Sequence, residues 1–203
     1  MEIVINLSGK ISSGKMEDTE RDILLRARQG QEGALREIIE KHEHHVAAAV
    51  TGILGNGPEV DDVGQETFVH FFRSLHRFRG DAKVGTYLTR IAINLSLNEL
   101  KRRKRYSQFF GEDFAGDSSF LPNQRNQESS VDTKRMVRDG LQQLPPEFRA
   151  VIVLRLINGY STRETAEILG LPHGTVLSRL ARGQAKLRQI VKDMSRHKSF
   201  MTR

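Results

Sequence analysis

The feature that most constrains this chain is the stretch 161–188, which carries two helix signals separated by a tight turn. Ser161 followed by Glu164 forms a capping box, in which each side chain satisfies a backbone N–H at a helix start. Gly170 permits the left-handed conformation that ends a helix, and Pro172 suits the first turn of the next one. The stretch therefore predicts a helix-turn-helix; the alternative is a helical hairpin with a solvated basic face.

The second helix of this motif has an apolar side and a basic side. Its apolar positions recur at helical spacing and define an inward stripe: Val176, Leu180, Leu187 and Val191. The other side has hydroxyls, cations and one imidazole but no acid: His173, Thr175, Ser178, Arg179, Arg182 and Lys186. Such a helix fits the major groove of duplex DNA, with its early residues near base edges and its later ones near phosphates.

Length and composition favour small helical domains over one large β core. The 203 residues allow one domain or two small ones; 37% are hydrophobic, and there is neither Trp nor Cys. The lack of Cys excludes disulfides and thiolate metal sites and is compatible with a reducing cytoplasm. An apolar run of about 18 residues is missing, so we expect no membrane insertion and a cytoplasmic location.

Residues 1–16 contain part of a phosphate-binding motif. Gly9, Gly14 and Lys15 have its spacing, but Met16 stands where Ser or Thr would hold Mg²⁺. The alternating strands and helices that such a loop needs do not follow it. We therefore expect an N-terminal extension, with an NTPase as the alternative.

A histidine cluster is the only grouping that resembles a metal site. His42, His44 and His45 lie close in sequence, yet the usual third protein ligand of a zinc site is not evident. We expect these histidines to lie at the surface or to line a groove, and we expect no metal and no cofactor.

An acidic segment precedes the first basic one. Residues 17–69 hold 12 acidic and five basic side chains, with two helices expected up to residue 54. The next helix carries a strong apolar stripe and begins with Asp61, Asp62, Gln65 and Glu66. Because acids also suit a helix N-terminus, two readings stay open: a solvated acidic face, or a docking surface for a basic protein.

Residues 70–105 form the first of two basic blocks, with ten basic and two acidic side chains. We expect a loop up to residue 86 and a helix over 87–105, whose outer face carries Arg90, Asn94, Asn98, Lys101, Arg102 and Arg105. Asn pairs with base edges, Lys and Arg neutralise phosphates, and an aromatic beside a loop stacks on an unpaired base. This half thus suits separated single strands, unless the basic run is only a solvated face.

The domain organisation follows from the break between the basic blocks. Residues 106–131 are rich in Gly, Ser, Asp, Asn and Gln without a sustained period, which is typical of a flexible linker. We predict an all-α protein with an extension at 1–16, a helical domain at 17–105, the linker, and a helix-turn-helix domain at 132–197.

Four stretches, in this order, resemble the extracytoplasmic-function (ECF) sigma factors, which are compact bacterial proteins with two helical domains. They are DDVGQETF at 61–68, FRGD with TYLTRIAIN across 78–94, LPPEFR at 144–149 and GTVLSR at 174–179. The resemblance covers roughly residues 17–190. It implies an RNA polymerase specificity subunit that directs transcription initiation and is not an enzyme.

The resemblance also implies a role for each block. Asp61, Asp62, Gln65 and Glu66 would bind the clamp coiled coil of core RNA polymerase. Recognition and melting of the promoter −10 element, held as single strand, would use Lys83, Thr86, Tyr87, Arg90, Asn94, Asn98, Lys101, Arg102 and Arg105. Reading of the −35 element as duplex would use His173, Thr175, Ser178, Arg179, Arg182 and Lys186. The linker would thread the polymerase channels, and an anti-sigma factor would be a further partner.

Two positions depart from the family pattern. Tyr87 stands where the family usually has Trp, and Leu177 stands where it usually has Lys or Arg. The alternative to a sigma factor is an autonomous helix-turn-helix transcriptional regulator, with an N-terminal dimerisation or sensor domain. Such a regulator needs neither the acidic face at 61–66 nor the basic block at 90–105.

Overall fold

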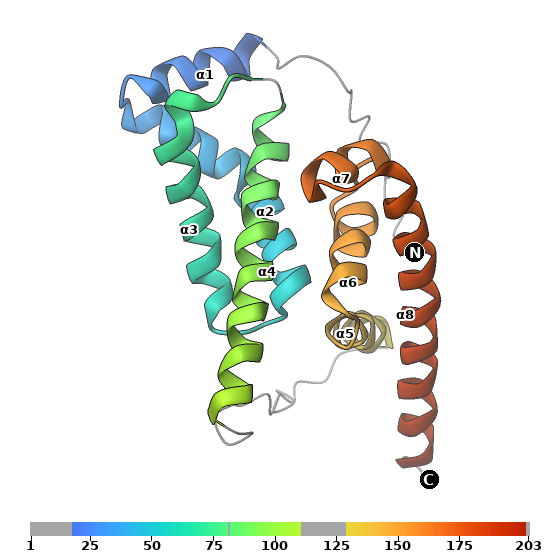
Figure 1. The fold of residues 1–203 in the computed structure, drawn as a ribbon. Coiled ribbons are helices and arrows are strands. Elements are labelled where there is room, and N and C mark those ends of the chain that lie inside the picture. The colour runs from blue at the N-terminus through green and yellow to red at the C-terminus, as the bar shows by residue number, and fades with distance from the viewer. Residues whose placement is uncertain (1–17, 81, 111–128, 202–203) are drawn as a thin grey trace.

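The structure is a computed structural model whose backbone is described for residues 18–80, 82–110 and 129–201. Over these ranges every regular element is a helix, which confirms the all-α prediction (Figure 1). Among them, none is long and apolar enough to cross a membrane. The phosphate-loop motif and most of the predicted linker lie outside the described residues.

The N-terminal half consists of α1 (Asp18–Arg28), α2 (Glu32–Leu54), α3 (Glu59–Ser74), the 3₁₀ turn η1 (Leu75–Arg77) and α4 (Val84–Phe110). Helices α2, α3 and α4 pack side by side, and α1 packs against α2 at one end (Figure 1). Fully buried apolar side chains of these three helices include Val50, Ile53, Phe71, Leu88 and Ile93. These contacts hold α4 rigidly along one side.

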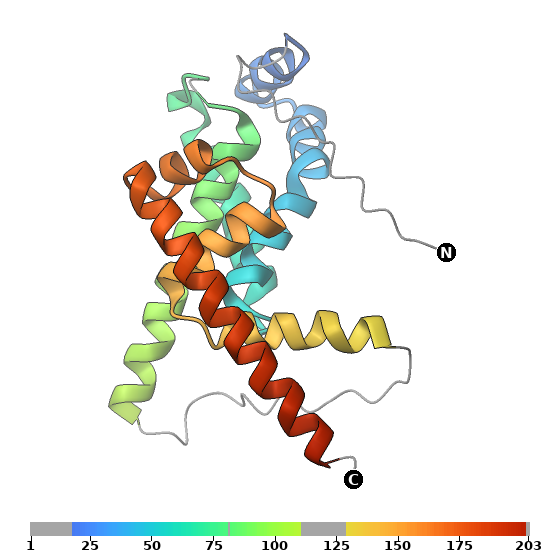
Figure 2. The same ribbon diagram turned by 90° about the vertical axis from the view of Figure 1, so that its right-hand side faces the viewer.

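The C-terminal half consists of α5 (Ser129–Gln142), α6 (Pro146–Ile152), the π-helical segment η3 (Val153–Ile157), α7 (Thr162–Leu169) and α8 (His173–Met201). Helices α6 and α7 lie between α8 and the N-terminal helices, so one long side of α8 faces outward (Figures 1 and 2). Gly183 permits this packing, because a Cβ there would lie 3.0 Å from a side-chain carbon of Ile152 in α6.

The helix-turn-helix forms as its sequence signals predict. The Ser161 side chain accepts from the backbone N–H of Glu164, whose carboxylate accepts from the N–H of Ser161 at 2.8 Å. Gly170 ends α7 with a φ of 62°, in the left-handed region that favours glycine. Val176 of α8 is fully buried, which fixes the side of α8 that faces the protein.

The two halves share one hydrophobic core. Ala150, Val153 and Leu154 of the C-terminal half belong to the same buried cluster as the side chains of α2, α3 and α4. Gly52 makes the closest approach possible, since a Cβ there would lie 2.8 Å from the methyl groups of Val153. In the described residues, the halves are thus packed together and not merely tethered.

Three helix limits differ from those expected. Helix α4 begins at Val84, whereas the sequence predicted a loop up to residue 86. Thr86 therefore lies in the first turn of the helix. The same helix continues to Phe110 beyond the predicted start of the linker, because the residues after 101 are mostly good helix formers without Gly or Pro. At the other side of the linker, α5 already begins at Ser129.

Candidate nucleic-acid interface

The outer face of α4 is open to solvent along its length. All six residues predicted there are exposed: Arg90, Asn94, Asn98, Lys101, Arg102 and Arg105. The opposite side is anchored by buried apolar residues, and the buried Ser96 hydroxyl is satisfied within the helix by the Ala92 carbonyl at 2.7 Å. A row of amides and cations on a rigid helix can pair with bases and neutralise phosphates without first becoming ordered.

Part of the positive charge on α4 is already paired. The Arg102 guanidinium makes two hydrogen bonds to the Glu99 carboxylate, at 2.7 and 2.9 Å. The hydrogen bond from Arg102 lowers the pKa of the Glu99 carboxyl, and burial raises it. The hydrogen bond has the larger effect, so the pKa is lowered. Arg103 lies 3.5 Å from the same carboxylate and also binds Glu59 of α3 at 2.5 Å, so it connects the two helices. Sequence analysis missed Glu99, although its spacing of three from Arg102 is a signal for a helical ion pair.

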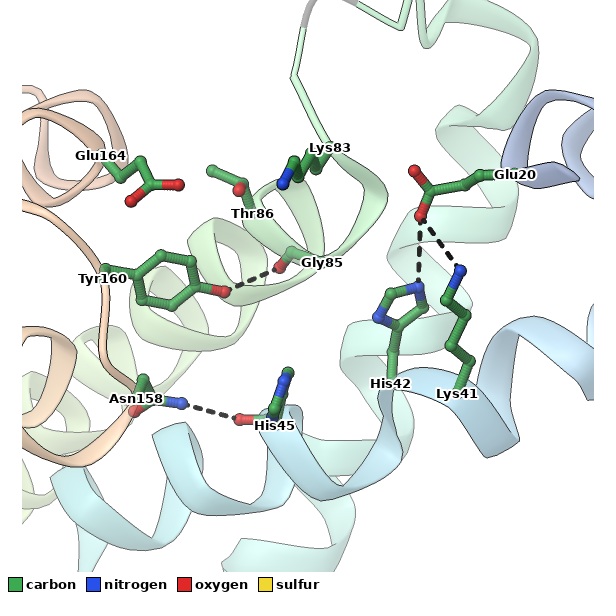
Figure 3. A pocket seen from close by; sticks show the side chains of 10 residues that line it. All are labelled: Glu20, Lys41, His42, His45, Lys83, Gly85, Thr86, Asn158, Tyr160 and Glu164. Atoms are coloured by element: carbon green, nitrogen blue, oxygen red, sulfur yellow. Dashed lines mark hydrogen bonds and ion pairs between the residues drawn. The ribbon is translucent and has the colours of Figure 1, made fainter. Parts of the chain in front are cut away.

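Lys83 and Thr86 do not join the outer face of α4. Both line a pocket of about 300 Å³ where the two halves meet (Figure 3). Its other lining residues come from both halves: Glu20, Lys41, His42, His45, Gly85, Asn158, Tyr160 and Glu164. In this packed arrangement the side chains of Lys83 and Thr86 face the C-terminal half. They are thus separated from the other residues predicted to contact the −10 element, which lie on the outer face of α4.

The histidine cluster is divided by the fold. His42 is buried, and its Nε2 lies 3.7 Å from the Glu20 carboxylate. We expected a surface or groove position; His42 is not at the surface, but it does line the pocket. His44 is exposed, and His45 lines the same pocket as His42. Partial burial and the neighbouring His42 and His44 lower the pKa of His45. Among the described residues, no group of three potential ligands could hold a metal ion.

Tyr87 is held by intramolecular aromatic contacts. Its ring centroid lies 5.1 Å from that of Phe78 and 6.0 Å from that of Phe71. Its hydroxyl donates to the Ser74 side chain at 3.4 Å. The half-buried ring therefore packs the loop before α4 onto α3, and the tyrosine at this position supports the fold through packing.

The acidic start of α3 is exposed as a group. Asp61, Asp62, Gln65 and Glu66 face solvent, while Val63 and Phe68 on the other side of the helix are buried. An exposed His70 lies with its Nε2 3.4 Å from the Glu66 carboxylate. A ridge of carboxylates on a well-packed helix can attract a basic protein surface.

The outward side of α8 carries most of the residues predicted for duplex DNA. His173, Ser178, Arg182 and Lys186 are exposed, whereas Thr175 and Arg179 are half-buried at one edge. The Lys186 ammonium lies 5.9 Å from the centroid of the Phe148 ring, which holds its charge beside the helix. In the described part of the chain, no ion pair is found for Arg179 or Arg182.

The chain matches two related sequence families in the order of its two halves. Residues 38–106 match Sigma-70 region 2, and residues 134–187 match Sigma-70, region 4. The ECF RNA polymerase sigma-E factor of Escherichia coli strain K12 is 30% identical over 88% of this chain and 97% of that protein. The RNA polymerase sigma-H factor of Pseudomonas aeruginosa is 28% identical over 89% of this chain and 97% of that protein.

Solved structures with the same fold include two protein complexes. CnrH, determined with the cytosolic domain of CnrY, superposes with a TM-score of 0.63 and 27% identity, over 87% of this chain and 99% of that one. The sigma factor RpoE of Bartonella quintana, determined with the anti-sigma factor NepR, gives a TM-score of 0.61 at 20% identity, over 77% of this chain and 96% of that one. The second similarity is one of fold alone.

Proposed function

The chain belongs to the ECF sigma factors of RNA polymerase, and we propose that it selects promoters through two outward helix faces while a third face holds the polymerase. It would act in the cytoplasm, as a subunit without catalytic chemistry of its own. The observation that carries the proposal is the separation of charge on one rigid framework. Exposed amides and cations lie along α4 and α8, and exposed carboxylates lie on α3.

The face of α4 suits the −10 element in single-stranded form. Asn94 and Asn98 are one helical turn apart, and both are exposed beside Arg90 and Lys101. Amide groups reach the hydrogen-bonding edges of unpaired bases, and the neighbouring cations hold the backbone. We propose that Lys83 and Thr86 contact DNA only after the C-terminal half moves away from them, because both line the pocket between the halves.

The face of α8 suits the −35 element as duplex. Its hydroxyls and guanidinium groups lie in the first three turns of the helix, where a recognition helix meets base edges in the major groove. We assign the domain limits on the same basis, with residues 17–105 for polymerase and −10 contacts and residues 132–197 for −35 contacts.

A protein inhibitor is the remaining partner in this proposal. CnrH was solved with the cytosolic domain of CnrY, and RpoE was solved with the anti-sigma factor NepR. By analogy, an anti-sigma factor would bind this chain and compete with polymerase.

Transcription with core RNA polymerase on a supercoiled promoter library tests the main proposal. The wild-type chain is expected to produce discrete new start sites, whereas an autonomous regulator would bind DNA alone and produce none. Asp62→Lys reverses a charge on the acidic face and is expected to abolish co-purification with polymerase while helix content stays unchanged.

Glu40→Lys is the matched control for this variant. Glu40 is an exposed acid of α2 outside the acidic face of α3, so the same charge change there is expected to leave polymerase binding intact. Normal co-purification of Asp62→Lys would refute the docking assignment. Equal losses in both variants would mean that polymerase responds only to net charge.

A further inference from the structure

A large apolar side chain projects from the outward part of α8. Leu177 is 49% exposed, although the preceding Val176 is fully buried in the core. Its neighbours one turn away include Gly174 and Ala181, which are small and exposed, beside the exposed His173 and the half-buried Leu180. Because Gly174 and Ala181 are small, Leu177 protrudes above the helix surface around them, and that part of α8 can approach another molecule closely.

Leu177 and Arg179 lie at opposite edges of the outward face. Successive residues of an α-helix are about 100° apart, and Val176 marks the inward direction. Ser178 and Arg182 therefore point outward, while Leu177 and Arg179 lie to either side of them. At the level of residues 174–181, the half-buried Arg179 thus forms a basic edge of the outward face, and Leu177 forms an apolar edge opposite it.

The major groove offers one group that matches the apolar edge. Base edges in that groove present hydrogen-bond donors and acceptors, and thymine adds its C5-methyl group. Leu177 has no donor or acceptor, so it cannot replace a cation at a phosphate or pair with a base edge. Resting on the proposed reading of the −35 duplex by α8, we propose that Leu177 is a specificity-determining residue that contacts a thymine methyl group there.

Removal of single methyl groups from the DNA tests this contact. Duplexes would be selected from a random −35 library by polymerase holoenzyme carrying the wild-type chain, and each thymine would then be replaced by deoxyuridine. Deoxyuridine lacks only the methyl group. At one position the wild-type holoenzyme is expected to lose affinity roughly three- to ten-fold, the order expected for one buried methyl group.

Variants of the chain assign the effect to Leu177. With Leu177→Ala, affinity is expected to fall for the thymine duplex and to be insensitive to deoxyuridine at that same position. The control is Leu156→Ala, which truncates another exposed leucine, in η3, and is expected to keep the full deoxyuridine pattern. Leu177→Met is expected to restore part of the sensitivity, since its side chain is also long and apolar.

Three outcomes would overturn the contact. They are a selected −35 duplex without thymine, a wild-type profile without a sensitive position, and a sensitive position that persists in Leu177→Ala. A loss in Leu177→Ala that is equal for thymine and deoxyuridine duplexes would instead indicate an apolar contact with a protein. Failure of the proposed function is distinguishable, because then the holoenzyme would select no −35 sequence at all.

Discussion

The surface on which the two halves meet carries polar groups, as the outward faces of α4 and α8 do, but it uses them differently. At the inner surface, the Tyr160 hydroxyl lies 2.7 Å from the Thr89 hydroxyl and 3.3 Å from the Gly85 carbonyl of α4. The Asn158 amide donates to the His45 carbonyl of α2 at 3.2 Å. On the outward faces, side chains such as Asn94 and Arg182 are exposed to solvent.

Arg149 shows the inner use of polar groups most clearly. Its guanidinium donates to the Ile53 carbonyl at 2.5 Å and to the Gln142 side-chain oxygen at 2.7 Å, and it also donates to the Gln142 and Leu144 carbonyls. Burial and the nearby Arg103 lower its pKa to about 10, so it stays protonated at neutral pH. One buried cation thus joins α6 to α2 and α5 through neutral oxygens.

This difference separates cohesion from recognition. A polar group that is satisfied inside the protein stabilises one arrangement, and its loss leaves its buried partners without a hydrogen bond. A polar group that faces water can exchange that water for a base or a phosphate. We therefore expect substitutions on the inner surface to change stability and substitutions on the outward faces to change DNA binding.

Arg149→Ala should have the largest effect on the inner surface. It leaves the carbonyls of Ile53 and Leu144 and the Gln142 oxygens without their donor, which we expect to cost about 3 kcal/mol of unfolding free energy. For a chain of this size the midpoint of thermal unfolding would fall by about 6–12 °C. Circular dichroism during heating measures this shift.

Arg163→Ala provides the comparison on the outside. Arg163 is exposed, and among the described residues its ion pair is with the exposed Glu167, at 3.2 Å, so its removal should change stability by less than about 0.5 kcal/mol. Similar melting points for Arg149→Ala and the wild type would contradict the role of Arg149 in joining the halves.

The local elements were predictable because their signals lie close together in the chain. The capping box at Ser161, the turn at Gly170 and the inward side of α8 are all set by residues within one or two helical turns. Exposed faces followed from the same helical periodicity, which is why all six outer residues of α4 are exposed as expected. The roles of these residues toward DNA remain predictions.

The shared core was not predictable, because its contacts join distant parts of the chain. Arg149 reaches Ile53 across 96 positions, and Tyr160 reaches Thr89 across 71. In the sequence, Arg149 is simply one of several arginines, and its burial depends on how the halves pack. The same long-range packing places Lys83 in a pocket that Tyr160 and Glu164 of the C-terminal half also line, and no local signal in the sequence indicates that position.

Glu99→Gln is expected to have a smaller effect, on the outward face of α4. It removes the carboxylate that binds Arg102 and frees that guanidinium for phosphate. Affinity of the chain for a single-stranded oligonucleotide should rise about two- to five-fold at low salt, with a salt slope steeper by up to about 0.7. Fluorescence anisotropy titrations at several salt concentrations measure both quantities.

A matched substitution far from α4 distinguishes local release from net charge. Glu37→Gln makes the same charge change and removes a carboxylate that lies 3.2 Å from Arg26 of α1. We expect this variant to leave oligonucleotide affinity almost unchanged. An equal rise in both variants would show that the outer face of α4 has no special part in binding.

The smallest effect should come from His45, which borders the inner surface. Because the pKa of His45 is lowered in the folded chain, the unfolded chain binds more protons at mildly acidic pH, and stability falls as pH drops below about 6.5. The imidazole is largely screened by water, so its share of the change in melting point between pH 7.5 and 5.5 should be about 1 °C.

His45→Gln is expected to remove this share, whereas the control His76→Gln, at an exposed position of η1, should keep it. Identical pH profiles for the wild type and His45→Gln would mean that protonation at the pocket does not weaken the contact between the halves.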